Sequence, residues 1–161
     1  MAFTTYEEAA ANFRRYLNDS PQLNTLDKAI EHTDDELVDY IQQALNELNF
    51  AYEPKTRYAL ADIAVVPGTD EGRIGWGMLR TGALLQLLTI KGVISSRNAI
   101  TYSDAGGVQV SEMDKYGRYL NFFNVLANKY ERQVLALKIR ANIEGAFGGV
   151  NSPLGFDYWY L

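Results

Sequence analysis

A long apolar repeat over residues 111–144 is the feature that most constrains how this chain of 161 residues can fold. The repeat proceeds by alternating steps of three and four residues, which is the period of an apolar seam on one α-helix. Ser111 and Asp114 form a capping pair at its start, and Gly145 is a natural stop. At 1.5 Å per residue the helix would be roughly 50 Å long, longer than a small domain needs for its own core. The seam consists of Met113, Tyr116, Leu120, Phe123, Ala127, Tyr130, Val134, Leu137 and Ala141.

A second apolar strip, formed by Tyr119, Phe122 and Leu126, lies beside the first two-thirds of the seam. It predicts that this part of the helix packs on more than one neighbour. The expected fold is mainly α: a helical bundle around one long C-terminal helix, with a β-hairpin insertion and an extended C-terminal tail. We expect one helical domain over residues 1–144, with the hairpin at about 99–111, and a flexible aromatic C-terminal arm over residues 145–161.

Composition limits the classes of function. With a net charge of −5, the chain is a poor candidate for general binding to nucleic acid or anionic membrane. The absence of cysteine removes disulfides and thiolate chemistry, and the single histidine, His32, excludes the usual multi-histidine metal sites. The hydrophobic content of 47% is enough for a real core. The sequence therefore predicts a globular protein without cofactors.

The N-terminal half reads as a series of helices. Apolar periodicity and breaker residues predict helices over residues 4–18, 33–50, 55–65 and 70–90, with a short helical turn over 23–30. The caps are threonines followed three residues later by glutamate: Thr4 or Thr5 with Glu7 or Glu8, and Thr33 with Glu36.

The helix predicted over residues 70–90 contains Gly75, Gly77 and Gly82, each of which opposes a helix by about 1 kcal/mol relative to alanine. Such a helix forms only if tertiary packing supplies more than this cost. Glycines on one side would let another backbone, such as that of the long helix, come close.

The period changes to two at residues 100–102 and 108–110, and the intervening Ser-Asp-Ala-Gly-Gly stretch has hairpin turn chemistry. An isolated hairpin is marginally stable in water. We therefore expect it either to lean on the helices or to pair with a neighbouring chain.

Three patterns that resemble functional sites have simpler explanations. The carboxylates at residues 34, 35, 36 and 39 open a predicted helix, where they complement its dipole, and they lack the spacing of an EF-hand. Gly145, Gly148 and Gly149 follow a helix instead of leading from a strand into one, so they are not a phosphate loop. The basic residues Lys129, Arg132, Lys138 and Arg140 near the end of the long helix are expected on dipole grounds alone.

The last residues of the chain are harder to explain within one subunit. They carry four aromatic rings in a glycine-rich segment that has little to hold it as a final core element. Exposed rings of this kind would form a sticky patch, so they either fold back or anchor in another chain. We expect the second. The rings belong to Phe156, Tyr158, Trp159 and Tyr160, followed by Leu161.

The order of these features resembles the head–tail adaptor (connector, or neck) proteins of tailed bacteriophages, which are small helical virion proteins that form a ring beneath the portal. The resemblance covers roughly residues 33–153 in layout, and its most specific part is the hairpin segment and the helix that follows. The matching stretches are Ser96-Arg-Asn98, residues 100–110, Asp114-Lys-Tyr-Gly-Arg-Tyr119, Lys129-Tyr-Glu131, Lys138, Asn142-Ile143, Gly148-Gly149 and Ser152-Pro153.

The resemblance implies a virion structural protein, not an enzyme, that lies in the neck between capsid and tail and is in the host cytoplasm before assembly. Its partners would be the portal protein, copies of itself in a ring, and the next neck or tail protein. Double-stranded DNA would pass through without sequence-specific binding, and no membrane is involved. The portal arm would be Phe156, Tyr158, Trp159, Tyr160 and Leu161, and the hairpin-tip contacts would be Tyr102, Asp104, Gly106 and Gly107.

Three alternatives stay open. Within the virion, the protein could instead be a tail-completion or tail-terminator protein. Outside it, a non-viral helical interaction protein could dimerise through the seam that runs from Met113 to Ala141. An enzyme would need an acid–base pair, a metal set or a nucleophile, and the sequence shows no recognisable example of these.

Overall fold

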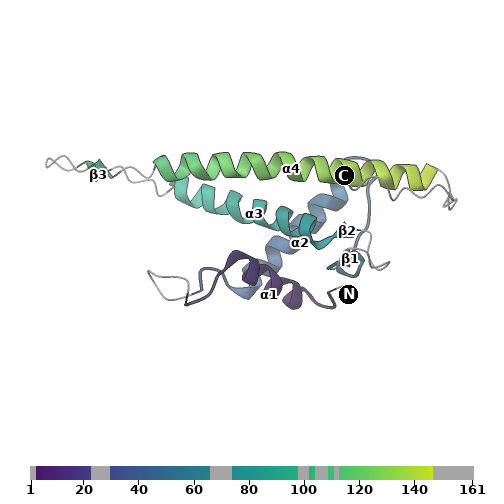
Figure 1. Ribbon diagram of the computed structural model, residues 1–161, viewed down its shortest axis with the longest axis horizontal. Coiled ribbons are helices and arrows are strands. Elements are labelled where there is room, and N and C mark those ends of the chain that lie inside the picture. The colour runs from purple at the N-terminus through teal and green to yellow at the C-terminus, as the bar shows by residue number, and fades with distance from the viewer. Residues whose placement is uncertain are drawn as a thin grey trace.

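The computed structural model of the protein describes residues 3–22, 30–65, 74–97, 102–103, 109–110 and 113–146. Within these residues the chain forms four α-helices: α1 (Tyr6–Leu17), α2 (Asp34–Phe50), α3 (Trp76–Arg97) and α4 (Met113–Ala146). They pack in succession, α1 on α2, α2 on α3 and α3 on α4 (Figure 1). The predicted mainly α architecture around one long C-terminal helix is confirmed.

The first two helices begin where their caps predict. The Thr5 side chain accepts a hydrogen bond from the Glu8 N–H, and the Glu8 carboxylate accepts one from the Thr4 N–H at 2.9 Å. Both halves of the capping box between Thr33 and Glu36 are present at the start of α2. These bonds satisfy amides that have no partner inside a helix. The turn predicted over residues 23–30 falls almost wholly outside the described residues.

Helix α3 is the centre of the bundle. Its apolar side chains point in several directions, and Leu79, Ala83, Leu84, Leu85 and Leu87 are all buried. A helix that is apolar all round must be covered on more than one side. In the structure α2 covers one side and α4 covers another. The helix starts at Trp76 and not at residue 70, and it runs to Arg97.

One glycine of α3 has the packing role that the sequence suggested. A Cβ atom added to Gly82 would lie 2.8 Å from the Tyr130 hydroxyl oxygen, so α3 approaches α4 closely here. The group that comes close is a side chain, not a backbone as predicted. Gly75 and Gly77 have open space around them, so close approach does not explain them.

The prediction of a helix over residues 55–65 is wrong. The segment is extended as far as a short 3₁₀-helix (Leu60–Asp62), and strand β1 (Ile63–Ala64) then pairs in parallel with β2 (Ile74–Gly75). Asn49 at the end of α2 fixes the extended part. Its side-chain amide donates to the Tyr58 carbonyl at 2.9 Å, and its oxygen accepts from the Tyr58 N–H at 2.8 Å. These bonds to the backbone outweigh the weak helical period of the sequence.

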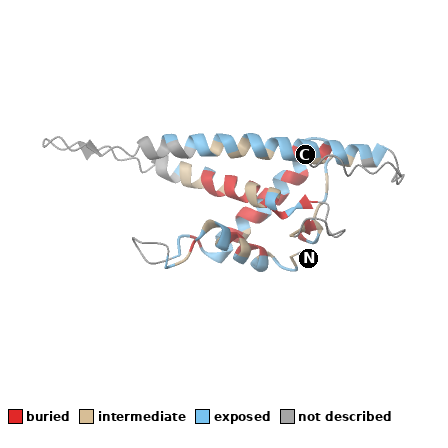
Figure 2. Cartoon of the chain, viewed as in Figure 1, coloured by how far each residue is buried: buried red, intermediate tan, exposed pale blue. Residues whose placement is uncertain are grey.

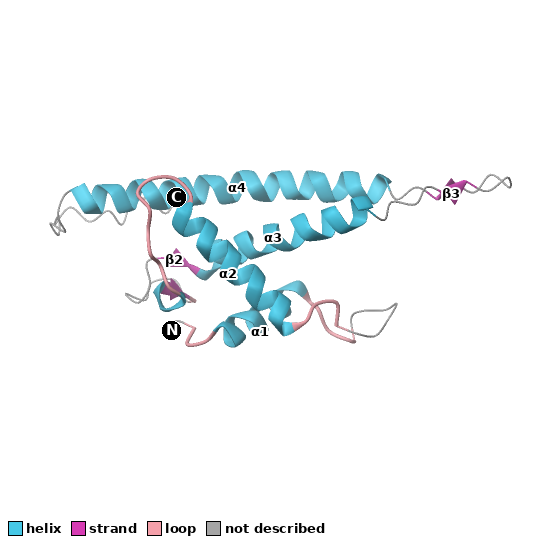
Figure 3. Cartoon of the chain, turned by 180° about the vertical axis from the view of Figure 1, so that it is seen from behind, coloured by secondary structure: helices cyan, strands magenta, loops and turns pink. Residues whose placement is uncertain are grey.

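The two strands of the predicted hairpin are present. Strand β3 (Tyr102–Ser103) pairs antiparallel with β4 (Gln109–Val110), with Tyr102 opposite Val110. Both views of the chain show β3 beyond the N-terminal end of α4, away from α1 and α2 (Figures 1 and 3). The hairpin was expected either to lean on the helices or to pair with a neighbouring chain. The described strands do not lean on the body of the bundle.

Helix α4 covers 34 residues and ends at Ala146, one residue after the predicted stop. It runs along one side of the bundle, and most of its outward surface is exposed (Figure 2). From Phe123 to Leu137 the seam faces the protein itself, because Val134 is buried and Phe123 and Leu137 pack against the core. Leu120, nearer the start of the seam, is 45% exposed. The prediction that the second strip is packed is confirmed for Leu126, which packs on the core, and wrong for Phe122, which is 53% exposed.

Candidate assembly surfaces

The structure places only part of the site predicted from sequence. Tyr102 lies in β3, whereas Asp104, Gly106 and Gly107 lie outside the described residues. The predicted portal arm also lies outside them: Phe156, Tyr158, Trp159, Tyr160 and Leu161. The described residues instead bring together two apolar surfaces that involve α4.

The first surface, here called the outer stripe, lies on the side of α4 opposite the bundle. Val125, Arg132 and Ile139 are spaced seven residues apart and therefore share one face of the helix. A parallel row lies beside it, in which Phe122 and Lys129 are seven residues apart and Lys129 and Ile143 are fourteen residues apart. Val125 is 67% exposed and Ile139 is 52% exposed. The outer stripe is thus an apolar strip with two cations at its middle.

The second surface, here called the groove, lies between α4 and the end of α2. It has a volume of about 500 Å³, and its apolar wall includes Phe50, which is 70% exposed. Two of the residues that line it, Glu47 and Glu131, carry carboxylates. The complete lining is Glu47, Phe50, Ala51, Tyr52, Tyr130, Glu131 and Val134.

A buried lysine holds the groove together. Lys138 is 1% exposed, and its ammonium donates to the Asn49 carbonyl at 3.0 Å, the Pro54 carbonyl at 3.2 Å and the Thr56 hydroxyl at 2.7 Å. It therefore joins α4 to the carbonyl end of α2, where a cation also complements the helix dipole. Burial lowers the pKa of Lys138, and the nearby charge of Lys55 lowers it further.

Two tyrosines connect the walls of the groove. The Tyr52 hydroxyl donates to the Glu131 carboxylate at 2.7 Å, and this bond raises the pKa of Tyr52. The Tyr130 hydroxyl donates to the Ala44 carbonyl at 3.4 Å. Burial raises the pKa of Tyr130 well above its usual range, and the charge of Glu47 adds to the effect. Both phenols therefore stay protonated at neutral pH and act as hydrogen-bond donors.

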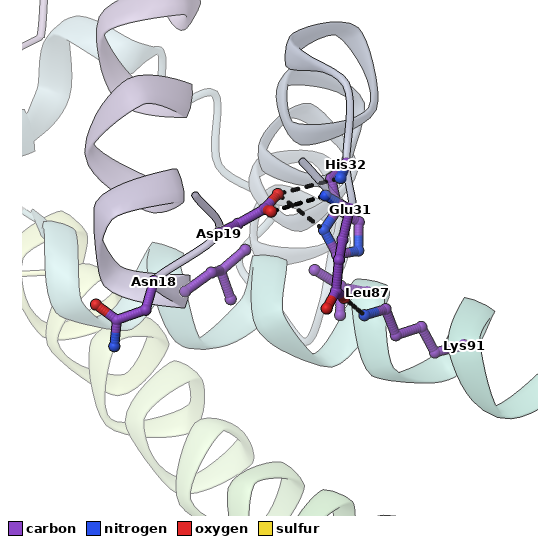
Figure 4. A pocket seen from close by; sticks show the side chains of 7 residues that line it. Asn18, Asp19, Glu31, His32, Leu87 and Lys91 are labelled. Carbon is purple, nitrogen blue, oxygen red and sulfur yellow. Dashed lines mark hydrogen bonds and ion pairs between the residues drawn. The ribbon is translucent and has the colours of Figure 1, made fainter. Parts of the chain in front are cut away.

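A smaller cavity of about 100 Å³ lies between α1, the start of α2 and α3 (Figure 4). Asp19 points into the space between these elements and accepts hydrogen bonds from the Glu31 and His32 amides at 2.7 and 3.1 Å, and it lies 3.3 Å from His32 Nδ1. The Asp19 carboxylate also forms an ion pair with Arg14 at 3.0 Å. Leu17, Asn18, Leu87 and Lys91 complete the lining, so among these described residues His32 meets no hydroxyl or thiol nucleophile. The polar groups around the cavity are best explained as bonds that join the end of α1 to the start of α2.

The acidic start of α2 is engaged within the fold. Asp34 forms an ion pair with Arg14 at 2.7 Å, and Glu36 completes the capping box. Within the described ranges, no three or more histidine, aspartate and glutamate side chains come together in a way that could hold a metal ion.

Sequence reasoning missed two residues that organise these surfaces. Lys138 was interpreted as part of a basic helix end, but it is buried and bonded across the bundle. The available signal was its place one turn after Val134, on the face of the seam. Asp19 lies just after the first predicted helix, and nothing in its sequence context predicts that its carboxylate would accept from the amides of residues 31 and 32.

Most of the described seam of α4 is covered within its own subunit. Phe123, Tyr130, Val134 and Leu137 face their own subunit, so these residues are not available as a dimerisation seam. Among the described helices, none combines the length and the apolar character needed to cross a membrane.

Comparison of the chain with protein-family models, with curated proteins and with solved structures gave no match.

Proposed function

We propose that this protein is a virion structural protein, a head-to-tail adaptor that forms a ring between portal and tail and contributes to the conduit for DNA. The observation that supports this most strongly is that the two opposite faces of α4 differ in burial. One face of the helix completes the bundle, and the opposite face carries Phe122, Val125, Ile139 and Ile143 exposed to solvent. An exposed apolar strip of this kind is typical of a surface that is covered on assembly.

The position of the hairpin supports the same role. Strand β3 lies past the end of α4 in both views, away from α1 and α2, which supports a contact of the hairpin with another chain (Figures 1 and 3). Two paired residues in each strand give little stability of their own. We propose that residues 102–107 contact a neighbouring subunit or the next neck or tail protein.

The charge of the chain is compatible with a conduit. With a net charge of −5, the protein does not offer the many cations that would hold DNA by neutralising its phosphates. A passage for DNA should present weak or repulsive walls, because strong binding would stop movement. Double-stranded DNA would therefore pass through the ring without specific binding, and the protein would be located in the neck of the virion.

The portal contact is proposed for the aromatic C-terminal residues, because rings clustered at one chain end are suited to anchoring in a partner's pocket. The test is native mass spectrometry of the chain mixed with the purified portal protein of the same virus. The full chain should give a ring complex with the portal, and a chain that ends at Gly155 should not.

A matched variant separates the rings from chain length. The full-length chain with Phe156, Tyr158, Trp159 and Tyr160 all changed to Ala should lose portal binding as completely as the truncated chain. If the truncated chain binds the portal as well as the full chain, the arm is not the anchor. If the full chain itself does not bind, the adaptor proposal fails.

A further inference from the structure

We propose that the groove of one copy receives the outer stripe of the next copy, so that the chain assembles head to tail through two different surfaces. This inference rests on the proposed ring and specifies how its subunits meet. It commits to a second copy of this chain as the occupant of the groove.

The distribution of exposed apolar side chains is the first argument. Within the described ranges, eleven large apolar residues are exposed, and six of them lie on α4. Four of these six belong to the outer stripe, Leu120 and Leu135 lie outside it, and Phe50 and Tyr52 line the groove. The remaining three are Tyr16, Ile30 and Val93. The two surfaces that need cover are therefore concentrated on α4 and beside it.

Charge complementarity is the second argument. The outer stripe carries Lys129 and Arg132 between its apolar ends, and both are exposed. The described residues that line the groove include two carboxylates, Glu47 and Glu131, and no cation. Lys55, close to the groove, is engaged by the Phe50 and Tyr52 carbonyls at 2.6 and 3.3 Å. A stripe seated in a groove would place cations beside carboxylates and apolar side chains beside Phe50. Two stripes facing each other would instead bring like charges together, which is unfavourable.

The geometry of α4 excludes contact within one subunit. Glu131 belongs to the groove and Arg132 to the stripe, and the two are adjacent residues of one continuous helix. A rigid helix cannot turn its own outer side into a groove on its other side. The partner of the stripe must therefore be another molecule, and the charge of the groove favours a second copy. A contact between two different surfaces propagates from copy to copy, and it gives a ring where the rotation between copies closes and an open filament where it does not.

Cysteine cross-linking tests the contact. Because the native chain contains no cysteine, every disulfide must form between the introduced residues. One variant combines Ala51→Cys in the groove with Val125→Cys in the stripe, and a second combines Ala51→Cys with Ile139→Cys. Under mild oxidation at increasing protein concentration, at least one of them should give a ladder of dimers, trimers and larger species on non-reducing gels. Each single variant should stop at a low yield of dimer.

The control pair is Ala51→Cys with Gln42→Cys, an exposed position of α2 outside both surfaces. It should give no ladder. A product that ends at the dimer for the groove–stripe pairs would mean a symmetric contact and would overturn the inference. Absence of cross-linking above the control would overturn it too.

Charge reversal gives a second readout. Arg132→Glu or Glu47→Lys, each added to the better cross-linking pair, should remove most of the ladder, and the two together should restore it. Failure of the double variant to restore the ladder would contradict the pairing. These outcomes are independent of the portal experiment: a ladder without portal binding rejects only the adaptor role, and portal binding without a ladder rejects only this contact.

Discussion

Helices α3 and α4 are both long and lie side by side, but they bury their residues in different ways. In α3, apolar side chains on several sides are covered by α2 and α4. In α4, Val134 and Lys138 are buried, while Phe122, Val125 and Ile139 of the opposite face are exposed. A helix covered all round is part of the fold, whereas a helix covered on one face has a second face available for a partner.

The largest difference should appear on truncating one side chain in each helix. Leu79→Ala in α3 removes a fully buried side chain and should lower the free energy of unfolding by about 2 to 5 kcal/mol. Val125→Ala in the outer stripe should change it by less than about 0.5 kcal/mol. Urea unfolding followed by circular dichroism measures both. Equal losses would mean that the outer stripe is covered within the subunit.

The next effect concerns the single buried cation described on α4. Lys138→Met keeps the side-chain stem but leaves the Asn49 and Pro54 carbonyls and the Thr56 hydroxyl without this donor. We expect a loss of about 1 to 3 kcal/mol in the free energy of unfolding. Lys129→Met, at an exposed position of the same helix, is the control and should have little effect on unfolding. A neutral Lys138→Met would show that the joint between α2 and α4 is not needed.

Two glycines of α3 should respond in opposite directions. Gly82→Ala places a methyl group against Tyr130, and overpacking of about 1 to 3 kcal/mol is partly offset by the better helix propensity of alanine. The net loss should reach up to about 2 kcal/mol. Gly92→Ala meets open space and should gain about 0.5 to 1 kcal/mol. Thermal unfolding of both variants decides this, and stabilisation by Gly82→Ala would refute the close approach of α3 and α4.

The smallest effect, that of removing the Tyr130 hydroxyl, should depend on pH in alkaline solution. The pKa of Tyr130 is raised above its value of 10.0 in an unfolded chain, so the folded state holds the phenolic proton more tightly. The resulting stability is complete below pH 10 and is lost as the pH rises further. Tyr130→Phe should cost only about 0.5 kcal/mol at pH 7, since its hydrogen bond is long. Above pH 10 the wild type should lose stability faster than the variant, and parallel pH profiles would contradict burial of the phenol.

Helices and caps were predicted correctly where the residues that determine them are close together in the sequence. The Thr33–Glu36 box fixes the start of α2 because its bonds join residues three apart. The long helix was predicted almost to its ends from the apolar repeat. The helix predicted over residues 55–65 failed because Asn49 binds the backbone of that segment from outside it. No period within the segment contains that information.

The same distinction applies to the candidate site. The sequence indicated which residues of α4 form an apolar seam, but not whether a partner or the protein itself covers it. Phe123 and Leu137 turned out to pack on their own bundle, which leaves the outer stripe as the open face. The groove could not be predicted, since Phe50 and Glu131 are far apart in the chain and meet only when α2 and α4 pack.

By itself the sequence determined that the chain is mainly helical, where α2 begins and that one helix is much longer than the others, because capping and periodicity act over a few residues. Only the tertiary structure decided which face of α4 is covered, why Gly82 must be small and where the Lys138 charge goes. These depend on which helices lie together, and that is fixed by the packing of distant side chains over the whole bundle.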